Sequence, residues 1–86
     1  MTARDFLIGY IADSWMDGDA AGLHEDTPLI ELNIIDSAAI FDLVHSLQDE
    51  FGVAVPLREI TPANFRSVGA ITALLGRLER EEKSVR

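Results

Sequence analysis

The chain contains serine, histidine and aspartate, which are residue types that could do chemistry, and it contains no cysteine. Ser37 directly follows Asp36, at the point where a helical repeat of apolar residues begins. A hydroxyl, an imidazole and a carboxylate could together form a hydrolase site, but no nucleophile-elbow motif surrounds Ser37 and no other catalytic signature is present. We therefore assign no catalytic residue and expect no enzyme activity.

A metal site is not expected either. His24 and His45 have no matching ligand spacing, which is typical of isolated surface histidines. Residues 17–22 faintly imitate the start of a calcium loop, yet Ala21 replaces a ligand and Pro28 occupies the place of the closing glutamate.

The segment Ser37–Phe51 has the clearest helical pattern in the chain. Asp36 is a good N-cap, because its carboxylate can accept hydrogen bonds from the first free backbone amides and favours the positive end of the helix dipole. Gly52 is suited to ending the helix. The apolar residues of this helix repeat at the spacing of one buried stripe, namely Ile40, Leu43, Val44, Leu47 and Phe51.

The same helix has a second face off the buried stripe, and we expect that face to dock partner proteins. Phe41 would stand there among carboxylates, one turn beyond the serine, which suits a docking contact. The alternative is that Phe41 belongs to the core, but Ile40 and Val44 fit the buried stripe better. The second face carries Ala38, Phe41, Asp42, His45 and Asp49.

Helices are also expected on both sides of this segment. An early helix ends near residues 17–19, and a last helix is capped by Ser67 and followed by a charged tail from Glu79 that we expect to fray. Residues 57–65 could hold one short helix, limited by Pro62. The stripes of the first and last helices are Leu7, Tyr10, Ile11 and Trp15, and Val68, Ile71, Leu75 and Leu78.

These elements predict an all-α fold, a four-helix bundle of three longer helices and one short helix. Residues 18–36 would form a long ordered loop between the first two helices, pinned to the core by apolar residues. With 86 residues, the chain is expected to be one domain over 1–86, with a core at about 3–80.

The charge of the chain limits its partners. Fifteen acidic residues against seven basic ones give a net charge of -8, which argues against nucleic acid and favours partners with basic surfaces. On charge alone, acidity that serves only solubility is an equal alternative. The amino terminus fits neither a signal peptide nor a membrane span, so we expect the chain to be cytoplasmic. We also expect it to be a monomer.

Taken in order, several segments resemble the phosphopantetheine-binding carrier proteins, which include acyl, peptidyl and aminoacyl carriers. Leu32-Asn33-Ile34-Ile35-Asp36-Ser37 is similar to the family's Asp-Ser attachment motif. Leu43-Val44 and residues 47–52 are similar to its second helix. Residues 60–68 are similar to its short third helix and the start of its fourth. The resemblance covers nearly the whole chain, whereas an Asp-Ser dipeptide alone would mean little.

The resemblance implies that Ser37 receives 4'-phosphopantetheine, whose thiol carries an acyl or aminoacyl thioester between biosynthetic enzymes. Asp36 would lie near the metal and phosphate chemistry of the modifying transferase. The implied partners are a phosphopantetheinyl transferase, an adenylating ligase or acyltransferase that loads the cargo, and downstream biosynthetic enzymes. The rival hypothesis is an acidic helical adaptor that binds a basic protein without any cofactor.

Two residues depart from the family pattern. Asn33 stands where glycine is common, and asparagine tolerates left-handed backbone better than most residues. Ala38 replaces a larger apolar residue after the serine, which bears on which transferase and partners recognise the chain. The Ile-Ile-Asp-Ser form looks more like stand-alone aminoacyl carriers than fatty-acid carriers. The loading enzyme's pocket, rather than the carrier, selects the cargo.

Overall fold

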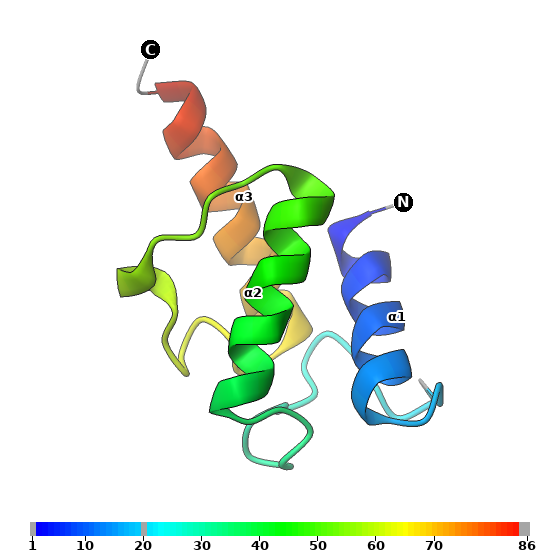
Figure 1. Cartoon of the computed structure of the whole chain (residues 1–86). Coiled ribbons are helices and arrows are strands. Elements are labelled where there is room, and N and C mark those ends of the chain that lie inside the picture. The colour runs from blue at the N-terminus through cyan, green and yellow to red at the C-terminus, as the bar shows by residue number, and fades with distance from the viewer. Residues whose placement is uncertain (1, 20, 85–86) are drawn as a thin grey trace.

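The structure is a computed structural model that describes residues 2–19 and 21–84. It contains three α-helices, α1 (Ala3–Trp15), α2 (Ser37–Phe51) and α3 (Val68–Ser84), and one short 3-10 helix, η1 (Leu57–Glu59) (Figure 1). Within those two ranges there is no β-strand. The predicted all-helical class is therefore confirmed.

α1 begins and ends where its sequence predicts. The Thr2 hydroxyl accepts a hydrogen bond from the Asp5 N–H at 3.1 Å, which satisfies one of the free amides of the first turn. Beyond the helix, Asp17 and Gly18 both have left-handed backbone, with φ of 53° and 81°. Such backbone cannot continue a right-handed helix, so the chain turns away.

α2 has the bounds that the apolar repeat predicts. At its start, Asp36 is the N-cap, and its carboxylate accepts a hydrogen bond from the Ala39 N–H at 2.9 Å. At its end, Gly52 adopts φ 64° and donates its N–H to the Gln48 carbonyl oxygen at 2.9 Å. Both ends are thus fixed by local backbone chemistry.

The core takes residues from all three α-helices, and α1 and α3 are in contact. The stripe predicted for α2 is buried except at Phe51, which is partly buried and stands edge-on to Phe6 of α1, with ring centroids 5.4 Å apart. Phe65, just before α3, is fully buried. The largest fully buried side chains of the described residues are Leu7, Ile11, Leu29, Ile35, Leu43, Leu47, Phe65, Val68, Ile71 and Leu74.

The connection between α1 and α2 is hydrogen-bonded to the start of α3. The Leu29 N–H donates to the Arg66 carbonyl oxygen at 2.8 Å, and the Gly69 N–H donates to the Glu25 carbonyl oxygen at 3.0 Å. A Cβ at Gly69 would lie 3.3 Å from that Glu25 oxygen, so glycine permits the close approach. These bonds join the connection to the start of α3, and the later part of the connection passes beneath the start of α2 (Figure 1).

Two residues of this connection bear on the sequence-based expectations. Asn33 adopts left-handed backbone, with φ 59°, which is the conformation that asparagine tolerates. Leu32 is 59% exposed, so it does not help to pin the connection as its apolar character suggested. Leu23, Leu29 and Ile35 are buried instead.

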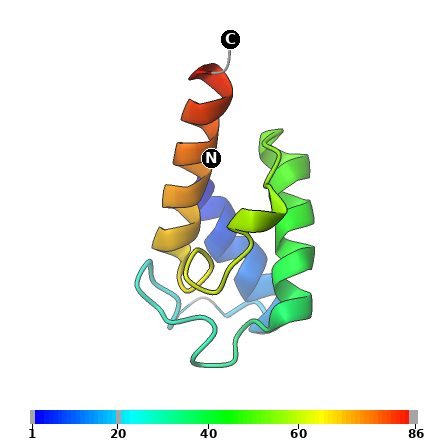
Figure 2. The same cartoon turned by 90° about the vertical axis from the view of Figure 1, so that its left-hand side faces the viewer.

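Residues 57–65 differ from the expectation of one short helix. η1 is a single 3-10 turn, and turns follow it up to Phe65. Pro62 explains the difference, because it lacks an N–H and disfavours helical backbone at the residue before it. This segment passes between α2 and α3 in the view of Figure 2.

α3 begins as predicted and runs further than predicted. The Ser67 hydroxyl accepts a hydrogen bond from the Ala70 N–H at 3.1 Å, which caps the helix. α3 then continues to Ser84, so the described part of the charged tail from Glu79 is helical, and the expectation that this tail frays stays a prediction. The chain ends of the expected 1–86 domain, residue 1 and residues 85–86, lie outside the described residues.

Candidate functional site

Ser37 is the first residue of α2, and its side chain is exposed. Within the described part of the chain its hydroxyl makes no hydrogen bond, so the oxygen is available to another molecule. Asp36, also exposed, is held by its bond to Ala39. The free amides and positive dipole end of the α2 first turn favour a negatively charged group at this position.

A shallow groove of about 110 Å³ adjoins Ser37. One wall consists of Ser37, Ile40 and Phe41 from α2, and the opposite wall consists of residues 60–62. Those three residues, Ile60, Thr61 and Pro62, were not predicted to belong to the site. No sequence spacing indicates them, because a turn rather than a periodic element brings them to α2. We call this feature the Ser37 groove.

The residues predicted to dock partners all lie exposed on α2. Phe41 is 51% exposed, which argues against the alternative that it belongs to the core. The full set is Ala38, Phe41, Asp42, His45 and Asp49, and the structure places all of them off the buried stripe. Leu57 on η1, which the sequence analysis did not single out, is also an exposed large apolar side chain, at 76%.

Glu59, at the end of η1, is bound from two directions. Arg77 of α3 donates two hydrogen bonds to its carboxylate, at 2.9 and 3.2 Å, and the Asn64 amide donates to its backbone oxygen at 2.8 Å and to its carboxylate at 3.1 Å. The hydrogen bond from Arg77 is the main cause that lowers the pKa of Glu59 below its ordinary value. Its carboxylate is therefore held in the charged form.

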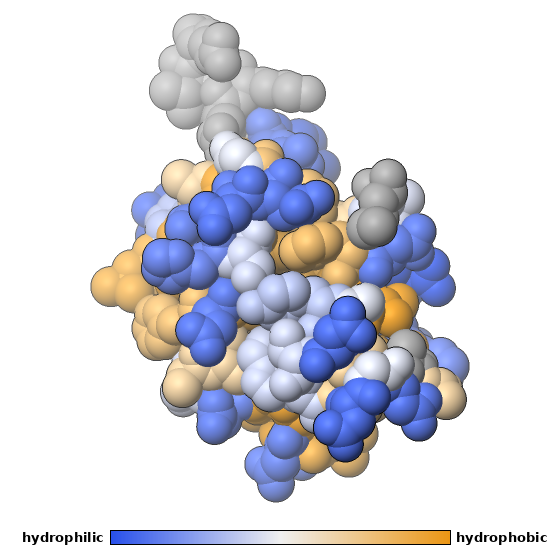
Figure 3. Space-filling view, turned by 45° about the vertical axis from the view of Figure 1, so that its right-hand side comes forward, coloured by the Kyte–Doolittle hydropathy of each residue, from blue (hydrophilic) through white to orange (hydrophobic). Residues whose placement is uncertain are grey.

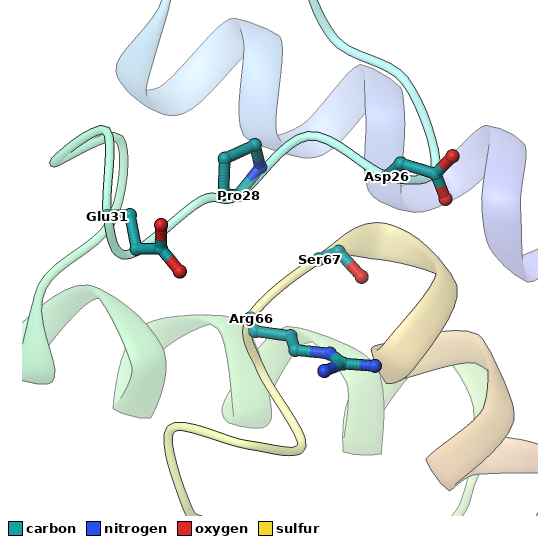
Figure 4. Close-up of a pocket in the computed structure, with 5 residues that line it drawn as sticks. All are labelled: Asp26, Pro28, Glu31, Arg66 and Ser67. Carbon is teal, nitrogen blue, oxygen red and sulfur yellow. The ribbon is translucent and has the colours of Figure 1, made fainter.

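A larger depression of about 280 Å³ lies beside the start of α3 and is lined by Asp26, Pro28, Glu31, Arg66 and Ser67 (Figure 4). Glu31 and Arg66 also line a neighbouring depression that reaches Pro62. None of the residues predicted for the site lines either depression. The lining of the larger one holds two carboxylates, one guanidinium and the Ser67 hydroxyl, which accepts the capping hydrogen bond from the Ala70 N–H.

The charged surface offers few other sites. Among the described residues, no group of three or more histidine, aspartate or glutamate side chains could hold a metal ion, and His24 and His45 lie exposed. In the same part of the chain, no helix is both long and apolar enough to span a bilayer. Figure 3 shows hydrophilic side chains spread over the α1 side of the molecule, with hydrophobic patches between them.

Residues 10–75 match the family described as "Phosphopantetheine attachment site". The chain belongs to this family of carrier proteins. It is similar to the "Probable acyl carrier protein PigG" of Serratia sp. (strain ATCC 39006), with 52% identity over 85% of this chain and 84% of that protein. It is also 31% identical to the "Lincomycin biosynthesis protein LmbN" of Streptomyces lincolnensis, of which it spans 30%.

One solved structure contains a chain with a similar fold. A chain in "Crystal structure of FAD-dependent dehydrogenase" superimposes on this carrier with a TM-score of 0.72 and 35% identity, over 80% of this chain and 97% of that chain. The matched chain is therefore shorter than this carrier, because 80% of this carrier aligns with 97% of that chain.

Family membership decides between the two functional hypotheses. The protein is an acyl carrier homologue that does not catalyse the reactions of its cargo, and its cofactor is phosphopantetheine. The hypothesis of an adaptor without a cofactor has no support from these relationships. The residues present fit the cofactor, because Ser37 presents an exposed hydroxyl with no hydrogen bond in the described structure, at a helix terminus that favours a phosphodiester.

Proposed function

We propose that Ser37 is the residue that carries the phosphopantetheine, and that Asp36 assists the modifying transferase. The observation that carries this proposal is the exposed hydroxyl of Ser37 at the start of α2. Asp36 is also exposed, and only one of its carboxylate oxygens accepts the capping bond from Ala39. The other oxygen is left for the transferase and its metal ion.

The modification needs little of the carrier itself. The Ser37 oxygen forms a bond to the phosphorus of coenzyme A that bears the pantetheine, the bond from that phosphorus to the adenosine 3',5'-bisphosphate breaks, and the serine proton passes to a base of the transferase. The attached group supplies a thiol on a flexible tether, which raises the effective concentration of the cargo at each partner. The carrier contributes position, exposure and a favourable dipole.

The exposed face of α2 is the surface that we propose for partner docking. Phe41 supplies apolar area next to Ser37, and Asp42 and Asp49 supply negative charge for basic partner surfaces. Ala38 and His45 complete this face. The partners are a phosphopantetheinyl transferase, an adenylating ligase or acyltransferase that loads the thiol, and downstream enzymes.

One class of downstream enzyme has particular support. The small chain that this carrier resembles occurs in a crystal structure described as an FAD-dependent dehydrogenase. We propose that a flavin-dependent dehydrogenase acts on the loaded carrier, taking a proton and a hydride from the cargo and reducing its own flavin. Incubation of the loaded carrier with such an enzyme should lower the intact mass by two hydrogen atoms.

We also propose how the loop and the short helix of the carrier fold are formed in this chain. Residues 18–36 act as the long ordered loop, and residues 57–65 take the place of the short helix in a four-helix carrier bundle. The chain works as one carrier domain, as a monomer, in the cytoplasm, where coenzyme A is available to the transferase.

Attachment at Ser37 is tested by intact-mass measurement. The apo protein is incubated with coenzyme A, magnesium and a promiscuous phosphopantetheinyl transferase. We expect the wild type to gain one phosphopantetheine, and Ser37→Ala to gain none. Ser14→Ala is the matched control, because Ser14 is an exposed helical serine on α1. No gain in the wild type, or an equal gain in Ser37→Ala, would reject the proposal.

A further inference from the structure

The two walls of the Ser37 groove are fixed by different means. The α2 wall belongs to a regular helix whose backbone hydrogen bonds hold it in place. The opposite wall, residues 60–62, follows a single 3-10 turn, and its backbone hydrogen bonds reach only neighbouring residues within 57–65, so none of them ties the wall to an α-helix. Segments of this kind open locally at low free energy unless side chains secure them.

Side chains secure this segment at both of its ends. Residues 60–62 lie in sequence between Glu59 and Asn64, and the Asn64 amide bonds both the backbone and the carboxylate of Glu59. Arg77 then fastens the Glu59 carboxylate to α3 with two parallel hydrogen bonds, at 2.9 and 3.2 Å. We call Glu59, Asn64 and Arg77 the Glu59 clasp.

The Glu59–Arg77 ion pair of the clasp is better shielded from solvent than the ion pairs that Arg4 forms. The Glu59 side chain is 16% exposed and the Arg77 side chain 39%. The ion pairs that Arg4 forms with Asp5 and Glu25 have all three side chains more than half exposed. A bidentate pair with less solvent around it is stronger and less screened by salt.

We propose that Glu59 and Arg77 are positioning residues for the reactions at Ser37. The clasp holds the wall formed by residues 60–62 at a fixed distance from Phe41, so that the transferase meets a preformed Ser37 groove. If the clasp is released, a partner must order the wall as it binds, and this ordering weakens binding. This inference rests on the proposed attachment at Ser37.

The expected kinetic effect follows from the same reasoning. The wall must be ordered both in the bound complex and in the transition state of the chemical step. Loss of the clasp should therefore weaken both states equally, which raises KM and leaves kcat nearly unchanged. For an interaction of this type we expect KM of the transferase for the carrier to rise about threefold to tenfold. A role in folding alone would not produce this division between KM and kcat.

The experiment is a double-mutant cycle on the apo protein. Glu59→Ala, Arg77→Ala and the double variant are modified with coenzyme A by a promiscuous transferase, and KM and kcat are measured by intact mass. Amide hydrogen exchange over residues 60–65 is measured in parallel. Each single variant should raise KM and speed the exchange, and the double variant should be no worse than the single ones. Glu59→Gln, which keeps the side-chain size, should raise KM less.

Arg4→Ala is the matched control. It removes an arginine that bonds Glu25 at 2.8 Å but lies on α1, and it should leave KM unchanged. Unchanged KM in both single variants, despite faster exchange, would overturn the positioning role. Additive effects in the double variant, or an equal rise in KM for Arg4→Ala, would also overturn it. If the wild-type protein gains no mass, the proposal of attachment at Ser37 fails. This outcome differs from a failure of the positioning role, in which the wild type is modified normally.

Discussion

Asp36 directly precedes the exposed Ser37, and its carboxylate accepts a hydrogen bond from the backbone N–H of Ala39 at 2.9 Å. This bond fixes the start of α2, and with it the direction in which the serine is presented. Asp36 therefore combines a structural task with its proposed role toward the transferase. Substitutions can separate the two, because an amide caps a helix about as well as a carboxylate.

We predict that Asp36→Ala lowers the free energy of unfolding by about 1 kcal/mol, while Asp36→Asn lowers it by only a few tenths. Urea unfolding followed by circular dichroism measures both values. If the charge of Asp36 serves the transferase, Asp36→Asn should keep its stability and still be modified more slowly at Ser37. Equal modification of Asp36→Asn and the wild type would reduce Asp36 to a helix cap.

The exposed position of Phe41 gives a second prediction. Phe41→Ala and Asp42→Lys should each weaken transfer to partner enzymes at least about fivefold, equivalent to about 1 kcal/mol, and keep the helix content. Leu43→Ala is the contrasting variant, because Leu43 is fully buried and its truncation should lower stability by about 2–5 kcal/mol. Normal transfer by Phe41→Ala together with lost stability would mean that Phe41 serves the core.

The sequence predicts those parts of the molecule that depend on local chemistry. The bounds of α2 follow from an apolar repeat, the Asp36 cap and Gly52, and all of these signals lie within the segment itself. Burial in the connection could not be predicted from apolar character alone, because Leu32 is 59% exposed and precedes the left-handed backbone of Asn33.

The far wall of the Ser37 groove could not be predicted for a different reason. Glu59 and Arg77 lie 18 residues apart in sequence, and no periodic pattern links an acidic residue on a turn with an arginine on a later helix. Tertiary packing alone brings them together. The exposure of Ser37 and of the second face of α2 was thus predictable, whereas the places of residues 60–62 and of the clasp were not.

Two glycines in helices should respond oppositely to alanine. Gly9 of α1 has open space where a Cβ would lie, so Gly9→Ala should raise the free energy of unfolding by about 0.5–1 kcal/mol. At Gly69 the added Cβ would press on the Glu25 carbonyl oxygen, 3.3 Å away, and Gly69→Ala should lower stability by about 1 kcal/mol. Thermal unfolding compares them. Equal stabilisation of both would show that the connection is not packed against α3.

Glu59 should make stability depend on pH. Its pKa is lowered in the folded protein, chiefly by the hydrogen bond from Arg77, so its contribution to stability is fully present above the ordinary glutamate value and is lost as the pH falls through the lower folded value. The stability difference between the wild type and Glu59→Gln should therefore shrink on acidification in this window. A difference that stays constant from neutral to acidic pH would show that the carboxylate is not held by the ion pair.

Salt should weaken the encounter between this carrier and its partners. The chain carries a net charge of -8, and charges at its surface act over about 10 Å at 0.1 M salt, so we expect KM for the transferase to rise several-fold as salt is added.

Asp42→Asn and Asp13→Asn are a matched pair, because both remove one exposed carboxylate from a helix. If α2 is the docking face, Asp42→Asn should reduce the dependence on salt and Asp13→Asn should not. Equal reductions would mean that net charge alone attracts the partner. An unchanged dependence in both would mean that neither carboxylate contributes to the encounter, which would count against docking through Asp42.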